Sequence, residues 1–136
     1  MRMQGKIGLV TAAASGMGRA GALRFAQEGA AVGVADIDEK GVAAVVNEIK
    51  AAGGKAHGIV ADLTRDEESR RVVSETARAF GGLDFVWNHV GHPGPAAFED
   101  LDLKEWDNAV ALNLRTVLVT TEAAIHVSNV MVCDSD

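Results

Sequence analysis

A run of small residues and a single carboxylate, set at a characteristic spacing, carry the clearest chemical signal in this chain. Ile7 to Val10 is apolar, and residues 11–18 then read Thr-Ala-Ala-Ala-Ser-Gly-Met-Gly. Small side chains let the amides at the start of a helix approach a phosphate closely. Asp36 lies 18 residues after Gly18, where a carboxylate can accept hydrogen bonds from both hydroxyls of an adenosine ribose and repel a 2′-phosphate. The pattern predicts a dinucleotide site that favours NAD over NADP.

Each of these signals has a simpler interpretation when it is taken alone. Gly16 to Gly21 matches the pattern G-x-G-x-x-G, but small residues also serve where a strand packs closely against a helix. Asp36 alone could cap a helix, since Asp38 and Glu39 follow it directly. The register between the small-residue loop and the carboxylate favours nucleotide binding.

The elements that position these residues alternate between strand and helix. Apolar runs predict strands at 7–11, 31–35, 55–61 and 83–87, and 127–133 is a candidate fifth strand. Helical patterns follow each strand, and Thr64 and Glu67 have the spacing of a capping box at a helix start. Such alternation predicts an α/β fold, a Rossmann-like doubly wound parallel sheet of four or five strands with helices on both faces. Residues 1–136 then form a single, incomplete dinucleotide-binding domain.

Composition narrows the classes of function. The 136 residues are 48% hydrophobic and 24% charged, which is typical of one globular domain. A formal net charge of −6 argues against binding nucleic acid. No apolar run reaches the roughly 18 residues that a membrane span needs, and the lone Cys133 fits a reducing compartment. We therefore expect no membrane association and a cytoplasmic location.

Five short motifs, in order along the chain, resemble those of the short-chain dehydrogenase/reductase family. Thr11 to Gly18 is similar to the family's T-G-x-x-x-G-x-G loop, and Asp36 ends the second expected strand. Ala61-Asp62-Leu63 ends the third, and Asn88-His89-Val90-Gly91 stands where the family has N-N-A-G. Leu112-Asn113-Leu114 resembles the helix that carries the family's asparagine. Together these landmarks extend over residues 5 to about 124.

The resemblance implies a nicotinamide dinucleotide as cofactor and a small alcohol or carbonyl substrate. It implies that Asp62 and the backbone of Leu63 meet the adenine, that Asn88 and the backbone near Val90 and Gly91 approach the nicotinamide ribose, and that Asn113 is catalytic. A basic residue at the position of Ser15 often marks NADP in the family, so Ser15 agrees with NAD. The complete set of expected cofactor-binding residues is Thr11, Ala12, Ser15, Gly16, Met17, Gly18, Asp36, Ile37, Asp62, Leu63, Asn88, His89, Val90 and Gly91.

The chain also departs from the family pattern. Ala12 stands where the family has glycine, at a cost of about 1 kcal/mol if that position needs a positive φ. His89 and Val90 replace asparagine and alanine and are expected to crowd the nicotinamide end. The family's catalytic Tyr-x-x-x-Lys pair has no counterpart, because the chain contains no tyrosine, and Ser135 near the family's serine position stays unassigned. We therefore expect a chain truncated before the catalytic segment and inactive alone.

Alternatives from other classes remain open at this point. One is a non-catalytic module that binds a nucleotide or a partner, because an apolar edge strand at 85–87 would invite pairing and makes a homo-oligomer the expected state. Another is a methyltransferase of related topology, which does not explain Thr11, Asn88 and Asn113 together. His89 and His92 share a loop without a third ligand nearby, so no metal site is predicted.

Overall fold

The computed structural model describes residues 1–94, 97, 99 and 101–133, so Ser135 lies outside the described residues. The described chain alternates strands and helices from its start to Trp87. After a loop, the helical elements between residues 103 and 133 follow one another without a break and form one long helical arm. The elements are β1 (Ile7–Thr11), α1 (Gly16–Gln27), β2 (Ala31–Asp36), α2 (Glu39–Ala51), β3 (Lys55–Val60), α3 (Asp66–Phe80), β4 (Phe85–Trp87), α4 (Leu103–Val110), the π-helical segment η1 (Ala111–Arg115) and α5 (Thr116–Cys133).

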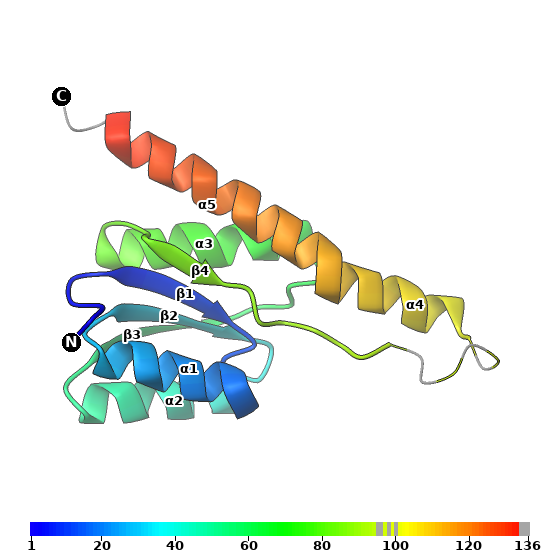
Figure 1. The fold of residues 1–136 in the computed structure, drawn as a ribbon, viewed down its shortest axis with the longest axis horizontal. Coiled ribbons are helices and arrows are strands. Elements are labelled where there is room, and N and C mark those ends of the chain that lie inside the picture. The colour runs from blue at the N-terminus through cyan, green and yellow to red at the C-terminus, as the bar shows by residue number, and fades with distance from the viewer. Residues whose placement is uncertain (95–96, 98, 100, 134–136) are drawn as a thin grey trace.

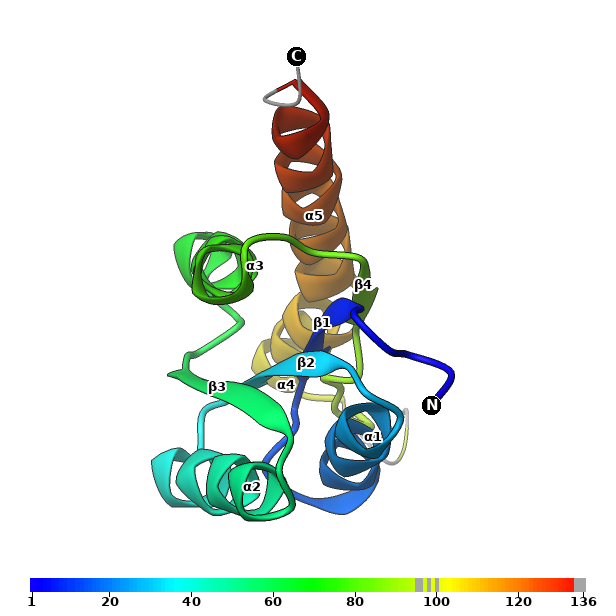
Figure 2. The same ribbon diagram turned by 90° about the vertical axis from the view of Figure 1, so that its left-hand side faces the viewer.

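The four strands form one parallel sheet in the order β3-β2-β1-β4. Helices α1 and α2 cover one face of the sheet, and α3 and α5 cover the other (Figures 1 and 2). The carboxyl ends of the strands all point toward the side where α4 lies (Figure 1). This arrangement confirms the predicted doubly wound α/β fold.

Side chains that point alternately to the two faces of the sheet form a separate hydrophobic core on each face. Val10, Val32 and Val34 are fully buried against the layer formed by α1 and α2. Leu9 and Ile59 point the opposite way and pack with residues of α3 and α5. Because successive side chains of a strand point to opposite faces, strands buried on both sides must be largely apolar, as the central strands β1 and β2 are.

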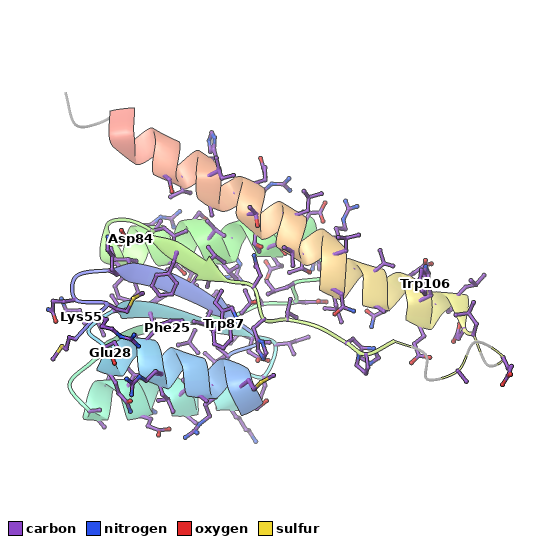
Figure 3. The ribbon with its side chains drawn as sticks, viewed as in Figure 1. Phe25, Glu28, Lys55, Asp84, Trp87 and Trp106 are labelled. Atoms are coloured by element: carbon purple, nitrogen blue, oxygen red, sulfur yellow. The ribbon has the colours of Figure 1, made fainter. Side chains whose placement is uncertain are left out.

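Aromatic side chains fill the space between α1 and the short strand β4. The rings of Phe25 and Trp87 (Figure 3) meet edge to face, with centroids 5.8 Å apart. The ring centroids of Phe25 and Phe85 lie 4.9 Å apart. Such pairs add about 0.5–1.5 kcal/mol to the burial of their surfaces. This packing holds β4 against β1 although β4 pairs with no other described strand.

The predicted capping box at Thr64 is wrong. Helix α3 begins at Asp66, and Arg65 occupies the N-cap position without a side-chain capping bond. The Thr64 hydroxyl donates instead to Asp62 Oδ1, at 2.7 Å, and its amide donates to the same oxygen at 3.0 Å. The turn that Asp62 forms competes successfully for the hydroxyl, as short polar side chains often do.

The predicted fifth strand at 127–133 is also wrong, because these residues continue α5. The Ser128 hydroxyl donates to the Ala124 carbonyl one turn earlier, and Val127 packs against the core beside α3. The β-branched residues here favour a strand only weakly, and continuing an established helix overrides that preference. The described sheet therefore has four strands.

The helical arm contains a widened turn in its middle. Residues Ala111–Arg115 are π-helical between α4 and α5. The Thr116 hydroxyl, 1% exposed, lies within hydrogen-bonding distance of the Ala111 carbonyl five residues earlier and of the Leu63 carbonyl after β3. Arg115 forms a paired salt bridge with Asp66 at the start of α3. These contacts fix the arm to the loop between β3 and α3.

Among the helices that the structure describes, none combines the length and the apolar character that crossing a bilayer requires.

Candidate functional site

A cavity of about 400 Å³ opens at the carboxyl edge of the sheet. This volume lies within the usual range for small-molecule sites. Its lining comes from the ends of β1, β2, β3 and β4 and from the helical arm. The lining residues are Ala12, Asp36, Ile37, Ala61, Asp62, Leu63, Thr64, Val90, Asn108 and Leu112. Crevices at this edge of open α/β sheets are where such folds bind ligands.

The Asp36 carboxylate joins the end of β2 to the small-residue loop. Its Oδ2 accepts a hydrogen bond from the Ala14 amide at 3.0 Å, and its Oδ1 accepts one from the Asp38 amide at 3.0 Å. Since each carboxylate oxygen has two acceptor sites, both oxygens keep capacity for a ligand. The loop is thus hydrogen-bonded to Asp36, and Ala12 lines the same cavity as this carboxylate, whereas residues 15–18 are not among the lining residues.

The first turn of α1 contains two glycines, which are needed for different reasons. Gly16 has a φ of +53°, which favours glycine. At Gly18 a Cβ atom would lie 1.9 Å from the carbonyl oxygen of Ala12, so only glycine permits this approach of α1 to the end of β1. Ser15, Gly16 and Met17 are exposed, and the Ser15 side chain makes no capping bond. The first amides of α1 are thus open to an anion.

Ala12 adopts a left-handed backbone conformation, with a φ of +51°. It is the only non-glycine residue in the described part of the chain with a positive φ. A Cβ atom in this region costs about 1–2 kcal/mol. The strain that the sequence predicts for an alanine in place of glycine is therefore present.

Thr11 supports the site from beneath. Its side chain is fully buried at the end of β1, so it offers no surface to a ligand. Its hydroxyl accepts hydrogen bonds from the amides of His89 and Val90, at 2.9 and 3.2 Å, and lies 3.4 Å from the Trp87 carbonyl oxygen. Thr11 thus ties the loop after β4 to the end of β1, which is a positioning role.

Asp62 presents a negative charge to the cavity. The hydrogen bonds from the hydroxyl and the amide of Thr64 hold the pKa of its carboxyl below the usual value. The group is therefore ionised at neutral pH and acts as an acceptor. Leu63 beside it is held by its carbonyl, which accepts hydrogen bonds from the hydroxyls of Ser69 and Thr116. Asp62 and Leu63 form a fixed wall of the cavity.

The side chains of Asn88 and His89, directly after β4, make their contacts away from this cavity. The Asn88 oxygen accepts a hydrogen bond from the Thr120 hydroxyl at 2.6 Å, and its amide nitrogen lies 3.5 Å from the Thr121 hydroxyl. The ring of His89 packs on Trp87, with centroids 5.0 Å apart, next to Gly18. Of the four residues 88–91, only Val90 lines the cavity.

Asn113 lies in η1, and its side chain is hydrogen-bonded to the backbone of the loop after β4. Its side-chain oxygen accepts from the His92 amide at 2.9 Å, and its side-chain nitrogen donates to the His92 carbonyl at 2.6 Å. Gly91 lies so close that a Cβ atom there would be 2.7 Å from the same oxygen. The Asn113 amide is therefore engaged with the backbone in this structure, and it positions the loop.

Four residues that line the cavity were not among the expected site residues. Ala61 and Thr64 flank the expected Asp62 and Leu63, whereas Asn108 and Leu112 belong to a different part of the chain. They stand four residues apart on the helical arm, and both line the cavity. A polar and an apolar residue at this spacing are ordinary on any helix. Only the placement of α4 across the carboxyl edge of the sheet distinguishes them.

Other hollows in the described chain fit a dinucleotide less well. A cavity of about 460 Å³ lies at the opposite edge of the sheet, between Gly29, Gly53 and Lys55. It faces the carboxyl ends of α1 and α2, whose partial negative charge disfavours phosphate. A groove of about 440 Å³ runs between β4 and α5. Within the described residues, no three of His, Cys, Asp and Glu are grouped to hold a metal ion.

Comparisons with known proteins agree with this architecture. The sequence model described as "short chain dehydrogenase" matches residues 6–131. A 2,5-dichloro-2,5-cyclohexadiene-1,4-diol dehydrogenase of Sphingobium indicum is 40% identical over 124 residues, covering 91% of this chain and 50% of the relative. The chain thus spans about half the length of the curated relatives it matches.

Solved structures resemble the fold over nearly all of the chain. A short chain dehydrogenase from Burkholderia cenocepacia, in complex with NADP, has a TM-score of 0.90 and 36% identity, covering 94% of this chain and 53% of that protein. A 7α-hydroxysteroid dehydrogenase complexed with NADH and 7-oxo glycochenodeoxycholic acid has a TM-score of 0.88 and 29% identity, covering 93% and 49% of the two chains. The similar structures thus include complexes with either form of the cofactor.

The strain at Ala12 is testable by substitution with glycine. We expect Ala12→Gly to raise the free energy of unfolding by about 1 kcal/mol, because glycine adopts the positive φ without strain. The greater conformational entropy that glycine gives to the unfolded chain offsets only part of this stabilisation. Urea denaturation followed by circular dichroism measures this difference. Ala13→Gly, at a buried neighbour without a positive φ, is the control and should lower stability. An Ala12→Gly variant as unstable as the control would contradict the account.

Proposed function

The chain belongs to the short-chain dehydrogenase family, and from this premise we propose that it forms the cofactor-binding part of an NAD-dependent oxidoreductase. The reaction is hydride transfer between the nicotinamide ring and the carbon of a small alcohol or carbonyl substrate. The observation that carries the proposal is the pairing of Asp36 with the loop before α1 at the mouth of one cavity.

The residues around the cavity fit such a cofactor. The exposed amides at the start of α1 suit the pyrophosphate, because Ser15, Gly16 and Met17 are exposed and the Ser15 side chain makes no capping bond to them. Asp36 retains acceptor capacity for the ribose hydroxyls, and Ile37, 69% exposed, offers an apolar edge next to it. Asp62 and the backbone of Leu63, which line the same cavity, would meet the adenine in this proposal. When bound, the cofactor supplies the hydride acceptor or donor.

Asp36 supports NAD rather than NADP as the cofactor. A 2′-phosphate on the ribose would meet the negative charge of this carboxylate, and no compensating cation stands at the position of Ser15. The relatives include complexes named for NADP and for NADH, so family membership alone leaves either cofactor possible. The proposed preference for NAD over NADP therefore rests on residues of this chain, Asp36 and Ser15.

The nicotinamide end depends on backbone and on positioning residues in this proposal. The backbone at Val90 and Gly91, held by Thr11 and Asn113, lines the approach to the nicotinamide ribose. The Asn88 side chain supports β4 from α5, and His89 supports α1, so we revise their expected direct contacts to indirect ones. Asn113 acts in the same indirect way through His92.

A non-catalytic binding module is the second candidate function. It is favoured by the groove between β4 and α5, which leaves a strand edge open to a further strand or a second copy of the chain. Self-association and a cytoplasmic location are part of our proposal in either case. The oxidoreductase part and the non-catalytic module would both bind the nucleotide at the same site. A measurement of turnover therefore distinguishes the two functions, whereas a measurement of nucleotide binding does not.

Cofactor preference is measured by titrating the chain with NADH and with NADPH and following nucleotide fluorescence. We expect NADH to bind at least about tenfold more tightly, since one unfavourable charge contact costs more than about 1.4 kcal/mol. Asp36→Asn removes the charge but keeps an oxygen for the loop, so the preference should shrink. Asp38→Asn, two residues away and exposed, should leave it unchanged. Tighter binding of NADPH by the unaltered chain would refute NAD specificity, and no saturation by either would refute the site.

Turnover separates the binding part from a complete enzyme. The 136 residues include no tyrosine, so no phenol in this chain can exchange a proton with the substrate. We expect the chain to bind NADH without reducing NAD when alcohols are added, as followed by absorbance. Robust reduction by protein freed of host dehydrogenases would show that another group acts as the base, and would overturn this expectation.

A further inference from the structure

Two exposed methionine side chains stand at opposite edges of the sheet. Met1 is 83% exposed and lines the cavity beside Gly29, at the edge away from the candidate site. Met17 is 72% exposed and lies in the first turn of α1, directly after the loop that follows β1. Met3, by contrast, packs against the hydrophobic core. Because a thioether is oxidised where an oxidant can reach it, Met1 and Met17 are the more reactive of these three residues.

The residues next to Met17 leave its sulfur unshielded. Gly16 and Gly18 on either side carry no side chain, and Ser15 before them is exposed. Apart from its chain neighbours, no heavy atom of the described residues would lie within 4 Å of a Cβ atom at Gly16. The space beside this turn is therefore open, and a small oxidant such as hydrogen peroxide can approach the thioether.

The position of Met17 in the helix directs its side chain toward the proposed anion site. Met17 is the second residue of α1, and the Cα–Cβ bonds of a helix tilt toward its amino end. The amides there have no capping side chain and carry partial positive charge, so they attract an acceptor. The sulfur of methionine is only a weak acceptor, which leaves these amides to a ligand.

We propose that Met17 is a reversible oxidation site, whose conversion to the sulfoxide weakens binding of the dinucleotide. This inference rests on the proposed function, because it assumes that the diphosphate of the cofactor binds at the first turn of α1. Hydrogen peroxide takes two electrons from the sulfur as its O–O bond breaks; one oxygen becomes bonded to the sulfur, and the other leaves as water. A methionine sulfoxide reductase reverses the change. Two thiols then supply two electrons and two protons, become a disulfide, and the oxygen leaves as water.

The oxygen that the sulfur gains accounts for the expected loss of affinity. Oxidation makes the flexible apolar side chain polar. Its oxygen, with partial negative charge, would accept hydrogen bonds from the amides at the start of α1 and repel the diphosphate. Oxidation of Met1 adds the same group at the opposite edge of the sheet, where we expect no effect on the dinucleotide.

The test measures NADH binding by the 136-residue chain before and after treatment with hydrogen peroxide. Mass spectrometry of peptides follows the gain of one oxygen at each methionine, and circular dichroism checks that the fold is retained. Fluorescence titration should give a dissociation constant about fivefold higher for the oxidised chain, since the sulfoxide competes for hydrogen bonds that the diphosphate needs. A methionine sulfoxide reductase supplied with a thiol should restore the original constant.

Three variants assign the effect to one sulfur. Met17→Leu cannot form a sulfoxide, so peroxide should leave its dissociation constant equal to that of its own untreated sample. Met3→Leu is the matched control, because it nearly conserves volume and keeps Met17, and it should lose affinity on treatment as the unaltered chain does. Met17→Gln, whose carboxamide oxygen is a strong acceptor near the place of the sulfoxide oxygen, should bind NADH more weakly without any oxidant.

Several results would overturn the inference. These are an equal loss of affinity in oxidised Met17→Leu, unchanged binding by a chain whose Met17 is fully oxidised, and a Met17 that resists peroxide while Met1 is converted. In each case NADH binding by the untreated chain leaves the proposed function intact. Absence of NADH binding by the untreated chain would instead refute the proposed function, and this inference with it.

Discussion

The hydrogen bond from the Ala14 amide to the Asp36 carboxylate is the interaction on which the site depends. It joins the first loop to the end of the second strand, and Ala12 of this loop and the carboxylate line one cavity. The same carboxylate turns the chain into α2 by accepting from the Asp38 amide. One side chain therefore holds two loops in place and still has acceptor sites for a ligand.

Two buried threonine hydroxyls hold other walls of the cavity in place. Thr11 fixes the loop after β4, and Thr116 fixes the helical arm to Leu63. Both side chains are essentially inaccessible, so their effect on a ligand passes through the backbone they hold. The π-helical turn at Ala111–Arg115 accommodates this arrangement, because it brings Asn113 to His92 while Thr116 reaches Leu63. Widened turns of this kind often mark functional regions of helices.

The sequence predicts the parts of this molecule that follow from local rules. Buried strands, the doubly wound parallel topology and the register between Gly18 and Asp36 could be inferred because apolar runs, glycine geometry and right-handed crossovers constrain them tightly. The predictions of a capping role for Thr64 and of a strand at 127–133 were wrong, because in each case a competing interaction outweighed the local preference. The turn at Asp62 took the hydroxyl, and helix α5 continued through the β-branched residues.

Side-chain direction at the site could not be predicted in the same way. Asn88 follows a strand at the carboxyl edge, as a ligand contact would, yet its amide turns toward α5. Asn108 is an exposed residue of α4, and it lines the cavity only because α4 lies across the carboxyl edge of the sheet. Both outcomes depend on where a helix lies relative to strands distant in sequence, which periodicity alone does not encode. The aligned motifs identified the family, while the packing of the arm determined what each asparagine touches.

The central claim is that the nucleotide binds at the carboxyl edge of the sheet, on the cleft shared by Asp36 and the loop before α1. A nuclear magnetic resonance titration of the ¹⁵N-labelled chain with NAD maps the site most directly, because it reports each backbone amide. The account predicts the largest shifts at the amides of residues 14–18 and at Asp36 and Leu63. Shifts concentrated instead around Gly29 and Gly53, at the opposite edge, would contradict it.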